Sequence, residues 1–367
     1  MNLIENTMYQ DDIMKIITHP LPWNKLQNKA LLISGATGLV GSFLIDVIML
    51  LNREQGLNCK VYSLGRNEDK AKSRFSYCYE SSLFQFISYD INLPFVRNDI
   101  GSVDYVLHLA SNTHPVAYAT DPIGTITTNI IGTQNMLEFA CAHHASRCVF
   151  ASSNEIYGEN RGDIEKFEEK YCGYIDCNTI RAGYPESKRC GEALCQAYIK
   201  QRGLDIVIPR LTRSYGPTML MSDTKAISQF ICKAIVGKDI VLKSEGTQYY
   251  SYTYVADAVC GLLYVLLLGK KGEAYNIADE SSDIMLRDLA KIIADSVGNK
   301  VVFEIPDAIE SMGYSKATKA RLDSTKLQEL GWKSIYDIQS GIQRTIKILS
   351  EIMTNEYEHL NAIQKLG

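Results

Sequence analysis

Tyr184 and Lys188 are the two residues of this sequence that most directly suggest chemistry. They lie four positions apart in residues 183–202, whose pattern predicts a helix, so both side chains would share one helical face. Ser153 lies about 30 residues upstream, directly after a predicted strand. A tyrosine phenol ordinarily ionises near pH 10, but a neighbouring ammonium favours the phenolate, which can take a proton from an alcohol. The serine hydroxyl would orient that alcohol; the alternative, a surface Tyr and Lys on a helix, is common for such a pair in isolation.

A glycine-rich segment near the start of the chain predicts a nucleotide site. The apolar run 31–33 indicates a buried strand, and helix-like spacing follows over residues 42–51. Gly35, Gly38 and Gly41 would allow, in turn, a tight turn, a close approach of backbone to a pyrophosphate, and packing of the helix on the strand. The phosphates would meet unpaired N–H groups at the helix N-terminus. Because a strand and a helix flank the glycines, we interpret the segment as a dinucleotide site rather than an ordinary glycine-rich turn.

The elements that must position these residues alternate along the chain. Strands are predicted at residues 31–33, 60–64, 86–89, 105–110, 147–151 and 204–209, and helices at 11–28, 42–51, 122–142 and 183–202. This alternation predicts an α/β fold with a Rossmann-type, doubly wound parallel sheet, whose ligands bind beyond the carboxyl ends of the strands. We divide the chain into an N-terminal helical extension (1–28), a mainly NAD(P)-binding Rossmann domain (29–212) and a smaller, mainly substrate-binding lobe (213–367) with interleaved segments. His108, inside an apolar run, is expected to be a buried, hydrogen-bonded core residue.

The end of the second predicted strand bears on the choice of dinucleotide. An acidic side chain there would accept a hydrogen bond from the ribose 2′-hydroxyl of NAD. The chain instead has Ser63, Gly65 and Arg66, so no carboxylate would repel a 2′-phosphate and a guanidinium could bind one. We expect NAD, with NADP as the alternative if Arg66 binds the phosphate rather than stacking on adenine or pointing to solvent. Asp90 and Ile91, after the third strand, are placed to contact the adenine.

Composition and charge argue against several classes of function. The 367 residues carry a formal net charge of −4, which leaves no basic excess to displace counterions from a nucleic acid. No apolar run reaches the roughly 18 residues that a membrane span needs, and residues 1–28 lack the pattern of a signal peptide. The ten cysteines form no CxxC pair or Cys/His cluster, which predicts reduced thiols and no metal site. We therefore expect a cytoplasmic protein that binds neither nucleic acid nor a membrane.

Five blocks of the sequence carry a resemblance to a known family. They are Gly35-Ala36-Thr37-Gly38-Leu39-Val40-Gly41, Thr128-Asn129-Ile130-Ile131-Gly132-Thr133, Tyr184-Pro185-Glu186-Ser187-Lys188, Arg210-Leu211-Thr212-Arg213-Ser214-Tyr215-Gly216-Pro217 and Leu330-Gly331-Trp332. Over residues 29–345 the chain resembles the extended short-chain dehydrogenase/reductases of the nucleotide-sugar epimerase/dehydratase family. The resemblance implies hydride transfer between a sugar carbon and NAD(P), a nucleotide-diphosphate sugar as substrate, and a homodimer formed through a helix pair that includes residues 183–202.

Taken with the residue patterns above, this resemblance assigns roles to individual positions. The expected catalytic residues are Ser153, Glu155, Tyr184 and Lys188. The expected cofactor contacts are Gly35, Thr37, Gly38, Leu39, Val40, Gly41, Arg66, Asp90, Ile91, Leu109, Ala110, Ser111, Asn129, Tyr184, Lys188 and Leu211. The expected substrate contacts are Asn112, Asn154, Arg213, Tyr250 and Arg321.

Within the family, three details make the chain most similar to the UDP-glucuronate decarboxylases. Ser111 with Pro115, Tyr118 and Asp121-Pro122-Ile123 resembles the loop after their fourth strand. Arg181-Ala182-Gly183-Tyr184, ending in Lys188-Arg189, resembles the start of their catalytic helix, and Ser153-Asn154-Glu155 resembles their Thr-Ser-Glu.

Glu155 would act on the sugar after oxidation at C4, whereas simple 4-epimerases tend to have a small or hydroxyl residue at this position. Alternatively, Glu155 binds sugar hydroxyls or caps local backbone. The 4,6-dehydratases that act on deoxythymidine-diphosphate glucose pair this glutamate with an aspartate where the present chain has Asn154, which disfavours that branch.

Two departures from the family pattern leave the exact reaction open. The family usually has Asn at the position of Arg213, and Thr-Arg where this chain has Tyr249-Tyr250, and that Arg grips the diphosphate. We expect Arg213 to supply the displaced charge, with Arg321 as a second candidate. The tyrosines at 249, 250, 252 and 254 would line a pocket for the base or, as alternate residues, form one face of a strand.

These departures, together with Gly65-Arg66, also fit an NADPH-dependent reductase of a nucleotide-linked keto-sugar. A decarboxylase or epimerase returns its hydride and would keep its cofactor bound, whereas a reductase must exchange it. An NAD(P)-binding protein without turnover is the alternative outside enzymology.

Overall fold

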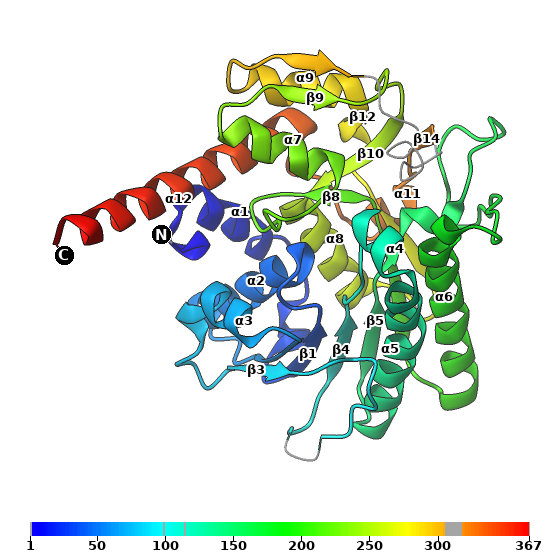
Figure 1. Ribbon diagram of the computed structural model, residues 1–367. Coiled ribbons are helices and arrows are strands. Elements are labelled where there is room, and N and C mark those ends of the chain that lie inside the picture. The colour runs from blue at the N-terminus through cyan, green and yellow to red at the C-terminus, as the bar shows by residue number, and fades with distance from the viewer. Residues whose placement is uncertain (1, 98–99, 114, 305–317, 367) are drawn as a thin grey trace.

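The computed structural model describes residues 2–97, 100–113, 115–304 and 318–366, and its centre is a parallel eight-stranded sheet (Figure 1). The strand order is β11-β7-β5-β4-β1-β2-β3, with β6 pairing with β7 off this path. These strands are β1 (Ala30–Ser34), β2 (Lys60–Gly65), β3 (Phe84–Ser88), β4 (Tyr105–His108), β5 (Arg147–Phe150), β6 (Ser152–Ser153), β7 (Ile206–Leu211) and β11 (Ala274–Ile277). The predicted doubly wound parallel sheet is confirmed.

Successive residues of β1 enter different hydrophobic cores. Leu31 and Ile33 pack in a cluster with residues of α2 (Leu39–Gln55) and α8 (Val255–Leu268), whereas Leu32 packs with residues of α5 (Pro122–Ala142) and α6 (Gly183–Arg202). Because side chains of a strand alternate between its faces, a sheet covered on both sides needs apolar residues at every position. This requirement explains the continuous apolar run that predicted the strand.

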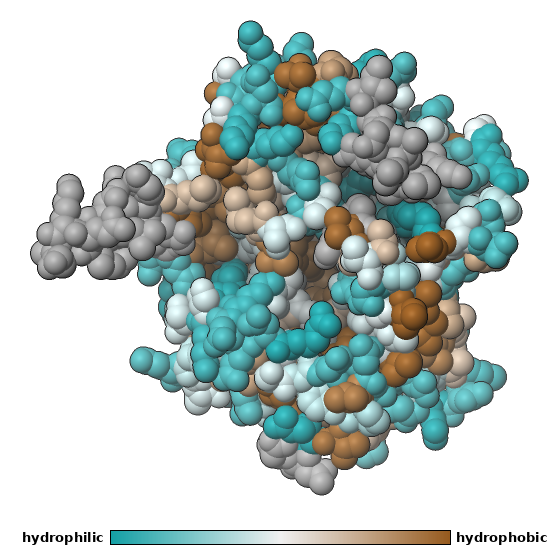
Figure 2. All heavy atoms as spheres, in the orientation of Figure 1, coloured by the Kyte–Doolittle hydropathy of each residue, from teal (hydrophilic) through white to brown (hydrophobic). Residues whose placement is uncertain are grey.

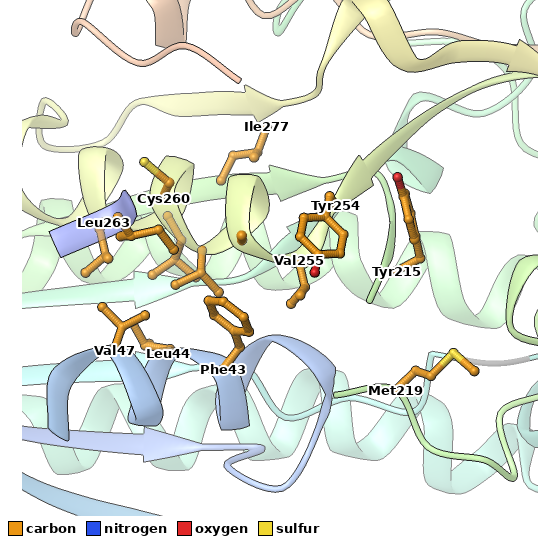
Figure 3. Packing of buried hydrophobic residues seen from close by; sticks show 14 of the residues in the cluster. Phe43, Leu44, Val47, Tyr215, Met219, Tyr254, Val255, Cys260, Leu263 and Ile277 are labelled. Carbon is orange, nitrogen blue, oxygen red and sulfur yellow. The ribbon is translucent and has the colours of Figure 1, made fainter. Parts of the chain in front are cut away.

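The contact between α2 and α8 joins the glycine-rich turn to the rest of the first core (Figure 3). Phe43, Leu44 and Val47 of α2 face Cys260 and Leu263 of α8 in this view, and all five side chains are fully buried. Full burial of side chains of this size is worth about 1.5–3 kcal/mol each. The start of α2, where a dinucleotide would bind, therefore rests on a rigid apolar support.

Both long helices on the other face begin and end where the sequence predicted. The side chain of Asp121 accepts a hydrogen bond from the Gly124 N–H, and Pro122 occupies the first turn of α5. Gly203 ends α6 in the left-handed conformation. The N-terminal end of α6 lies next to α5 and carries Tyr184 in its first turn.

A smaller mixed sheet packs beyond the carboxyl edge of the large one. In it β8 (Arg213–Tyr215) and β14 (Lys319–Ala320) run parallel to β10 (Tyr249–Tyr254), and β12 (Asp283–Met285) runs antiparallel to it. A separate pair joins β9 (Ile240–Leu242) and β13 (Val301–Phe303). The helices of this region are α7 (Ala226–Ile235), α9 (Leu286–Asp295), α11 (Thr325–Gln328) and α12 (Ile338–Leu366). Because α8 and β11 return to the large sheet, the C-terminal half contributes to both sheets.

The N-terminal helix predicted over residues 11–28 is the clearest difference from expectation. The structure has α1 (Thr7–Ile17) and a separate 3-10 turn, η2 (Trp23–Leu26). Pro20 and Pro22 lie between them, and proline cannot continue a helix interior because it lacks an N–H and clashes with the preceding turn.

The remaining short elements connect these layers. They are α3 (Glu68–Arg74), α4 (Pro115–Thr120), η1 (Leu3–Glu5), η3 (Ser76–Cys78), η4 (Asn154–Tyr157), η5 (Ile180–Ala182) and η6 (Glu280–Ser282). None of the helices within the described ranges combines the length and apolar content needed to cross a bilayer. All ten cysteines are free thiols, five of them buried.

Candidate active site

The structure brings the predicted serine, tyrosine and lysine together at the carboxyl edge of the large sheet. Ser153 ends β6 and pairs with Leu211 of β7 in parallel register. Ser153 and Ser111, which follows β4, both lie within hydrogen-bond reach of the Tyr184 hydroxyl. Lys188 follows Tyr184 one turn later on α6. Two strand ends and one helix therefore converge on a single phenol.

Tyr184 lies in a site of opposing influences. Burial, together with the negative charge of Glu155, raises the pKa of its phenol above the ordinary value of 10.0. The hydrogen bonds from Ser153 and Ser111 and the positive charge of Arg181 act on that pKa in the opposite direction. The pKa of this phenol is therefore set by opposing effects of its neighbours, as at many catalytic sites.

Lys188 is buried and its ammonium is held by protein groups. Nζ donates to the carbonyl oxygen of Ala151 at 2.8 Å and lies 4.9 Å from the centre of the Phe150 ring. Burial lowers the pKa of Lys188 from 10.5 to about 8. A lysine of this kind can gain or lose its proton near neutral pH, unlike an exposed one.

Glu155 has a fixed partner that the sequence did not reveal as a site residue. Nη2 of Arg181 lies 2.9 Å from Oε1 and 2.8 Å from Oε2 of Glu155. The guanidinium carbon is also 4.9 Å from the centre of the Tyr118 ring, which stacks on Tyr184 with 4.8 Å between centroids and 27° between planes. In the sequence, Arg181 and Tyr118 stand out only as parts of blocks that resemble the family. No spacing rule links them to Glu155, because the three residues lie in separate segments.

The glycine-rich turn has the geometry that a dinucleotide requires. Gly35 has a φ of +72°, and a Cβ there would lie 2.7 Å from the Ala110 nitrogen. A Cβ on Gly41 would lie 2.4 Å from the Gly35 oxygen, so neither position accepts a larger residue. Gly38 is the N-cap of α2 and provides no side-chain cap for its first N–H groups. The cradle therefore fits the pyrophosphate of NAD, with these N–H groups as donors.

Other predicted cofactor contacts line the same edge. Thr37, Leu39 and Val40 are half-buried in the turn and the first turn of α2. Leu109, Ala110 and Ser111 follow β4, and Ser111 Oγ donates to Asn129 Oδ1 at 2.7 Å. Asn129 Nδ2 in turn donates to Ser187 Oγ at 2.9 Å, which connects the loop after β4 to α6.

The far end of the predicted cofactor site lies beyond β2 and β3. Asp90 accepts a hydrogen bond from the Asn92 N–H, and buried Ile91 lies against Gly132 of α5. Arg66 directly follows β2 and is exposed. Within the described ranges the Arg66 guanidinium forms no ion pair, and the end of β2 carries no carboxylate.

His108 takes no part in this chemistry, as the sequence predicted. Its Nδ1 is 2.8 Å from Ser34 Oγ and its Nε2 is 3.1 Å from Thr133 Oγ1. Burial, followed by the positive charge of Lys188, lowers the pKa of His108 to about 3. It is a neutral core residue that joins β1, β4 and α5.

The predicted substrate residues divide between two faces of β10. The guanidinium carbon of Arg213 lies 3.5 Å from the centre of the Tyr250 ring, and its buried Nη1 has no hydrogen-bond partner in the described part of the chain. Arg321 lies 4.5 Å from the Tyr249 ring centre and pairs with Glu165 at 3.1 Å. Because adjacent residues of a strand point to opposite faces, the two arginines are on opposite sides of β10.

The register of the strands places Arg213 close to the predicted catalytic serine. Leu211 pairs with Ser153, so Arg213 lies two residues beyond the strand partner of the predicted catalytic serine. Tyr250, Tyr252 and Tyr254 are all buried, so they form one face of a strand, as one of the two interpretations predicted.

The two predicted asparagine contacts lie near the serine loops. Asn154 is buried at the start of η4, directly after Ser153. Nδ2 of half-buried Asn112 lies 3.5 Å from Thr125 Oγ1.

Comparison with known proteins places this site in a family context. Residues 31–278 match the model of the NAD dependent epimerase/dehydratase family. UDP-glucuronic acid decarboxylase 1 of Xenopus tropicalis is 31% identical over 333 residues, which cover 90% of this chain and 75% of the relative. UDP-glucuronic acid decarboxylase 5 of Arabidopsis thaliana is 31% identical over 319 residues, covering 86% and 87%.

Solved structures show the same fold at lower identity. A dTDP-glucose 4,6-dehydratase from Streptomyces venezuelae, crystallised with NAD and TYD, superposes with a TM-score of 0.75 at 24% identity, covering 88% of this chain and 97% of that one. A UDP-glucuronic acid 4-epimerase from Bacillus cereus, in complex with UDP-glucuronic acid and NAD, superposes with a TM-score of 0.72 at 21% identity, covering 88% and 99%.

Proposed function

The chain belongs to the NAD-dependent epimerase/dehydratase family, and from that premise we propose that it oxidises a nucleotide-diphosphate sugar at C4 and acts as a UDP-glucuronate decarboxylase. The observation that carries the proposal is the position of Glu155, whose charge acts directly on Tyr184 in a site that also holds Ser153 and Lys188. Two relatives about 30% identical over most of the chain are named as UDP-glucuronic acid decarboxylases. A carboxylate beside the proton-transfer group is what chemistry beyond simple oxidation would use.

The first step assigns a role to each side chain of the site. Tyr184, as phenolate, takes the proton of the C4 hydroxyl, while Ser153 donates a hydrogen bond that orients the same oxygen. Lys188 supplies positive charge behind the tyrosine and would contact the ribose of the dinucleotide. Gly35, Gly38 and the start of α2 would hold the pyrophosphate. When bound there, NAD supplies the acceptor for the C4 hydride and later returns it.

Decarboxylation follows from the electronics of the oxidised sugar. A carbonyl at C4 is β to the carboxylate on C5, so when the C5–carboxyl bond breaks, its electron pair moves into the C4 carbonyl and CO2 leaves. The enolate oxygen formed lies beside Tyr184 and Ser153, which can donate to it. A proton then returns to C5 and hydride to C4, so the product is a UDP-pentose and the cofactor is unchanged.

One alternative function and one binding role rest on specific residues. Arg66 follows β2, whose own residues include no carboxylate, which favours NADP and would fit an NADPH-dependent reductase of a keto-sugar. Arg213 is stacked on Tyr250 with one buried nitrogen unpartnered in the described part of the chain, which supports it as the phosphate ligand in place of an Arg at position 250.

The experiment identifies the dinucleotide first and the reaction second. The purified protein is denatured and the released dinucleotide is identified by mass spectrometry; the native protein is then given UDP-glucuronate. We expect one NAD per chain, release of CO2 and formation of a UDP-pentose. Bound NAD with a change of configuration but no CO2 would replace decarboxylation with epimerisation. An empty protein that prefers NADPH would replace it with net reduction.

We also propose a homodimer formed through α5 and α6. Large apolar side chains are exposed on α4, α5 and the segment before α6, and Figure 2 shows brown surface gathered over these elements. They are Val116, Ile123, Ile126, Ile131 and Ile180. Light scattering on the purified protein should give twice the monomer mass, and Ile123→Glu, at the most exposed of the helical positions, should reduce it to the monomer mass.

A further inference from the structure

We propose that Arg181 is a positioning residue of the catalytic centre: held by Glu155 and by the ring of Tyr118, it is the fixed positive charge that offsets the Glu155 carboxylate beside Tyr184. The inference rests on the proposed function, because it explains how a carboxylate needed for the later chemistry can share a site with a tyrosine that must become an anion. The structure supports it through three contacts between three separate segments.

The first contact fixes the charge. A single nitrogen of Arg181 lies within 2.9 Å of both carboxylate oxygens of Glu155, and the side chains are 34% and 23% exposed. Partial burial makes such an ion pair stronger and less sensitive to salt than one on the open surface. Burial lowers the pKa of Arg181, but Glu155, followed by Tyr118 and Tyr184, raises it above its ordinary value, so the guanidinium remains charged throughout the working range of pH.

The second and third contacts fix the orientation of the Arg181 guanidinium. Arg181 lies over the Tyr118 ring, and Tyr118 stacks on the ring of Tyr184. The Arg181 cation, the rings of Tyr118 and Tyr184 and the Glu155 carboxylate therefore form one connected cluster that includes the reacting phenol. A planar guanidinium suits this arrangement because it can stack on an aromatic face while donating in its own plane.

The positive charge of Arg181 lowers the pKa of Tyr184 and therefore opposes the effect of Glu155. Titratable or charged groups face this phenol and its stacked partner from each surrounding element: Glu155 from η4, Arg181 from η5, Tyr118 from α4, Lys188 from α6 and Asp223 from the loop before α7. Glu155 disfavours a phenolate at Tyr184 and Arg181 favours it, whereas Asp223 acts on the stacked Tyr118. Removing Arg181 alone leaves Glu155 uncompensated; removing both returns the site close to balance.

The test measures Tyr184 itself and uses no sugar. Protein labelled with carbon-13 at the tyrosine ζ position is titrated by NMR from about pH 6 to about pH 12 with saturating NAD, whose positively charged nicotinamide would lower the pKa of a nearby phenol. Tyr184 is assigned as the signal that Tyr184→Phe removes. Arg181→Met is expected to raise the Tyr184 midpoint by about one pH unit, Glu155→Gln to lower it by a similar amount, and the double variant to return it to within about half a unit of the original protein.

Several outcomes distinguish this role from a structural one. Equal midpoints in all variants, or a double variant that behaves like Arg181→Met alone, would overturn the proposal. Arg181→Lys should keep the midpoint within about half a unit because it keeps the charge. Arg161→Met is the matched control, because Arg161 also lies over a tyrosine (Tyr174, 4.4 Å) and near a glutamate (Glu159, 4.0 Å), but on the exposed surface. Failure to release CO2 from UDP-glucuronate would remove the proposed reaction without changing these midpoints.

Discussion

The carboxyl edge of the large sheet and the tyrosine-bearing face of β10 hold their polar groups in different ways. At the edge, Tyr184 and Lys188 come from one helix, and their partners come from the ends of neighbouring parallel strands. On β10, Arg213 stacks on a ring and keeps a buried nitrogen without a partner among the described residues. At the edge the polar groups are held mainly by contacts within the chain, whereas a buried cationic nitrogen without a hydrogen-bond partner is one that a ligand could satisfy. We therefore propose that the first region defines the class of reaction and that the second selects the substrate.

Replacing Tyr184 with Phe should have the largest effect, and only at the edge. The change removes the group that takes the C4 proton, and losing a general base typically costs about 10²–10⁴-fold in rate. Reduction of the bound cofactor by UDP-glucuronate, followed by the absorbance of the reduced nicotinamide, measures the step directly. Binding of the nucleotide sugar should remain within threefold of the original value, roughly 0.6 kcal/mol.

Tyr105→Phe serves as the control for that variant. Tyr105 begins β4, at the opposite end of the sheet, and donates to the Lys25 carbonyl at 3.1 Å. It should keep its activity. Equal losses in both variants would mean that the edge is not the chemical centre.

Replacing Gly35 with Ala should have the next largest effect, on the same edge. The new Cβ would meet the Ala110 nitrogen at 2.7 Å in a backbone conformation with φ of +72°. Strain and overpacking together should cost about 2–4 kcal/mol of folding free energy and reduce NAD affinity. Gly56→Ala is the matched control, because Gly56 has a φ of +62° but nothing within 4 Å of its Cβ position. Its cost should be about 1 kcal/mol, from backbone conformation alone, with NAD binding unchanged.

Sequence patterns predicted the edge well because local physics determines it. Helices α5 and α6 have the predicted bounds, since Asp121 with Pro122 starts one and Gly203 ends the other. The prediction of the N-terminal helix was wrong beyond Ile17, because Pro20 and Pro22 cannot continue a helix.

Residues brought together by long-range pairing were beyond sequence reasoning. Arg213 and Arg321 looked like alternatives for one role, yet the register of β8, β10 and β14 places them on opposite faces. The ion pair between Arg181 and Glu155 joins two turns whose separation in the sequence carries no period. Such contacts depend on how the sheets pack, which no local pattern records.

Replacing Arg213 with Asn tests the β10 side of the comparison. The change removes the cation but leaves an amide, so affinity for UDP-glucuronate should fall tenfold or more, roughly 1.4 kcal/mol. Isothermal titration calorimetry with the NAD-loaded protein measures it, and NAD content should not change. Arg321→Asn is the control from the opposite face of β10 and should alter affinity by less than about twofold. If Arg321→Asn has the larger effect, the assignment of the two faces to their roles is reversed.

Replacing Lys188 with Met should give the smallest change in free energy, and a change of the opposite sign. The folded protein gains stability but loses activity. Burial lowers the pKa of Lys188 to about 8, below its unfolded value, so at pH 7 the folded protein carries a desolvation cost of up to about 3 kcal/mol. Loss of the hydrogen bond to Ala151 offsets part of the gain, leaving about 1 kcal/mol. In the original protein the neutral amine forms as pH rises above 8 while the unfolded chain stays protonated to about 10.5, so stability rises over that window and the advantage of the variant disappears. Urea unfolding at pH 7 and pH 10 measures both values. A stability gain of equal size at the two pH values would mean that Lys188 carries no buried charge in the folded protein.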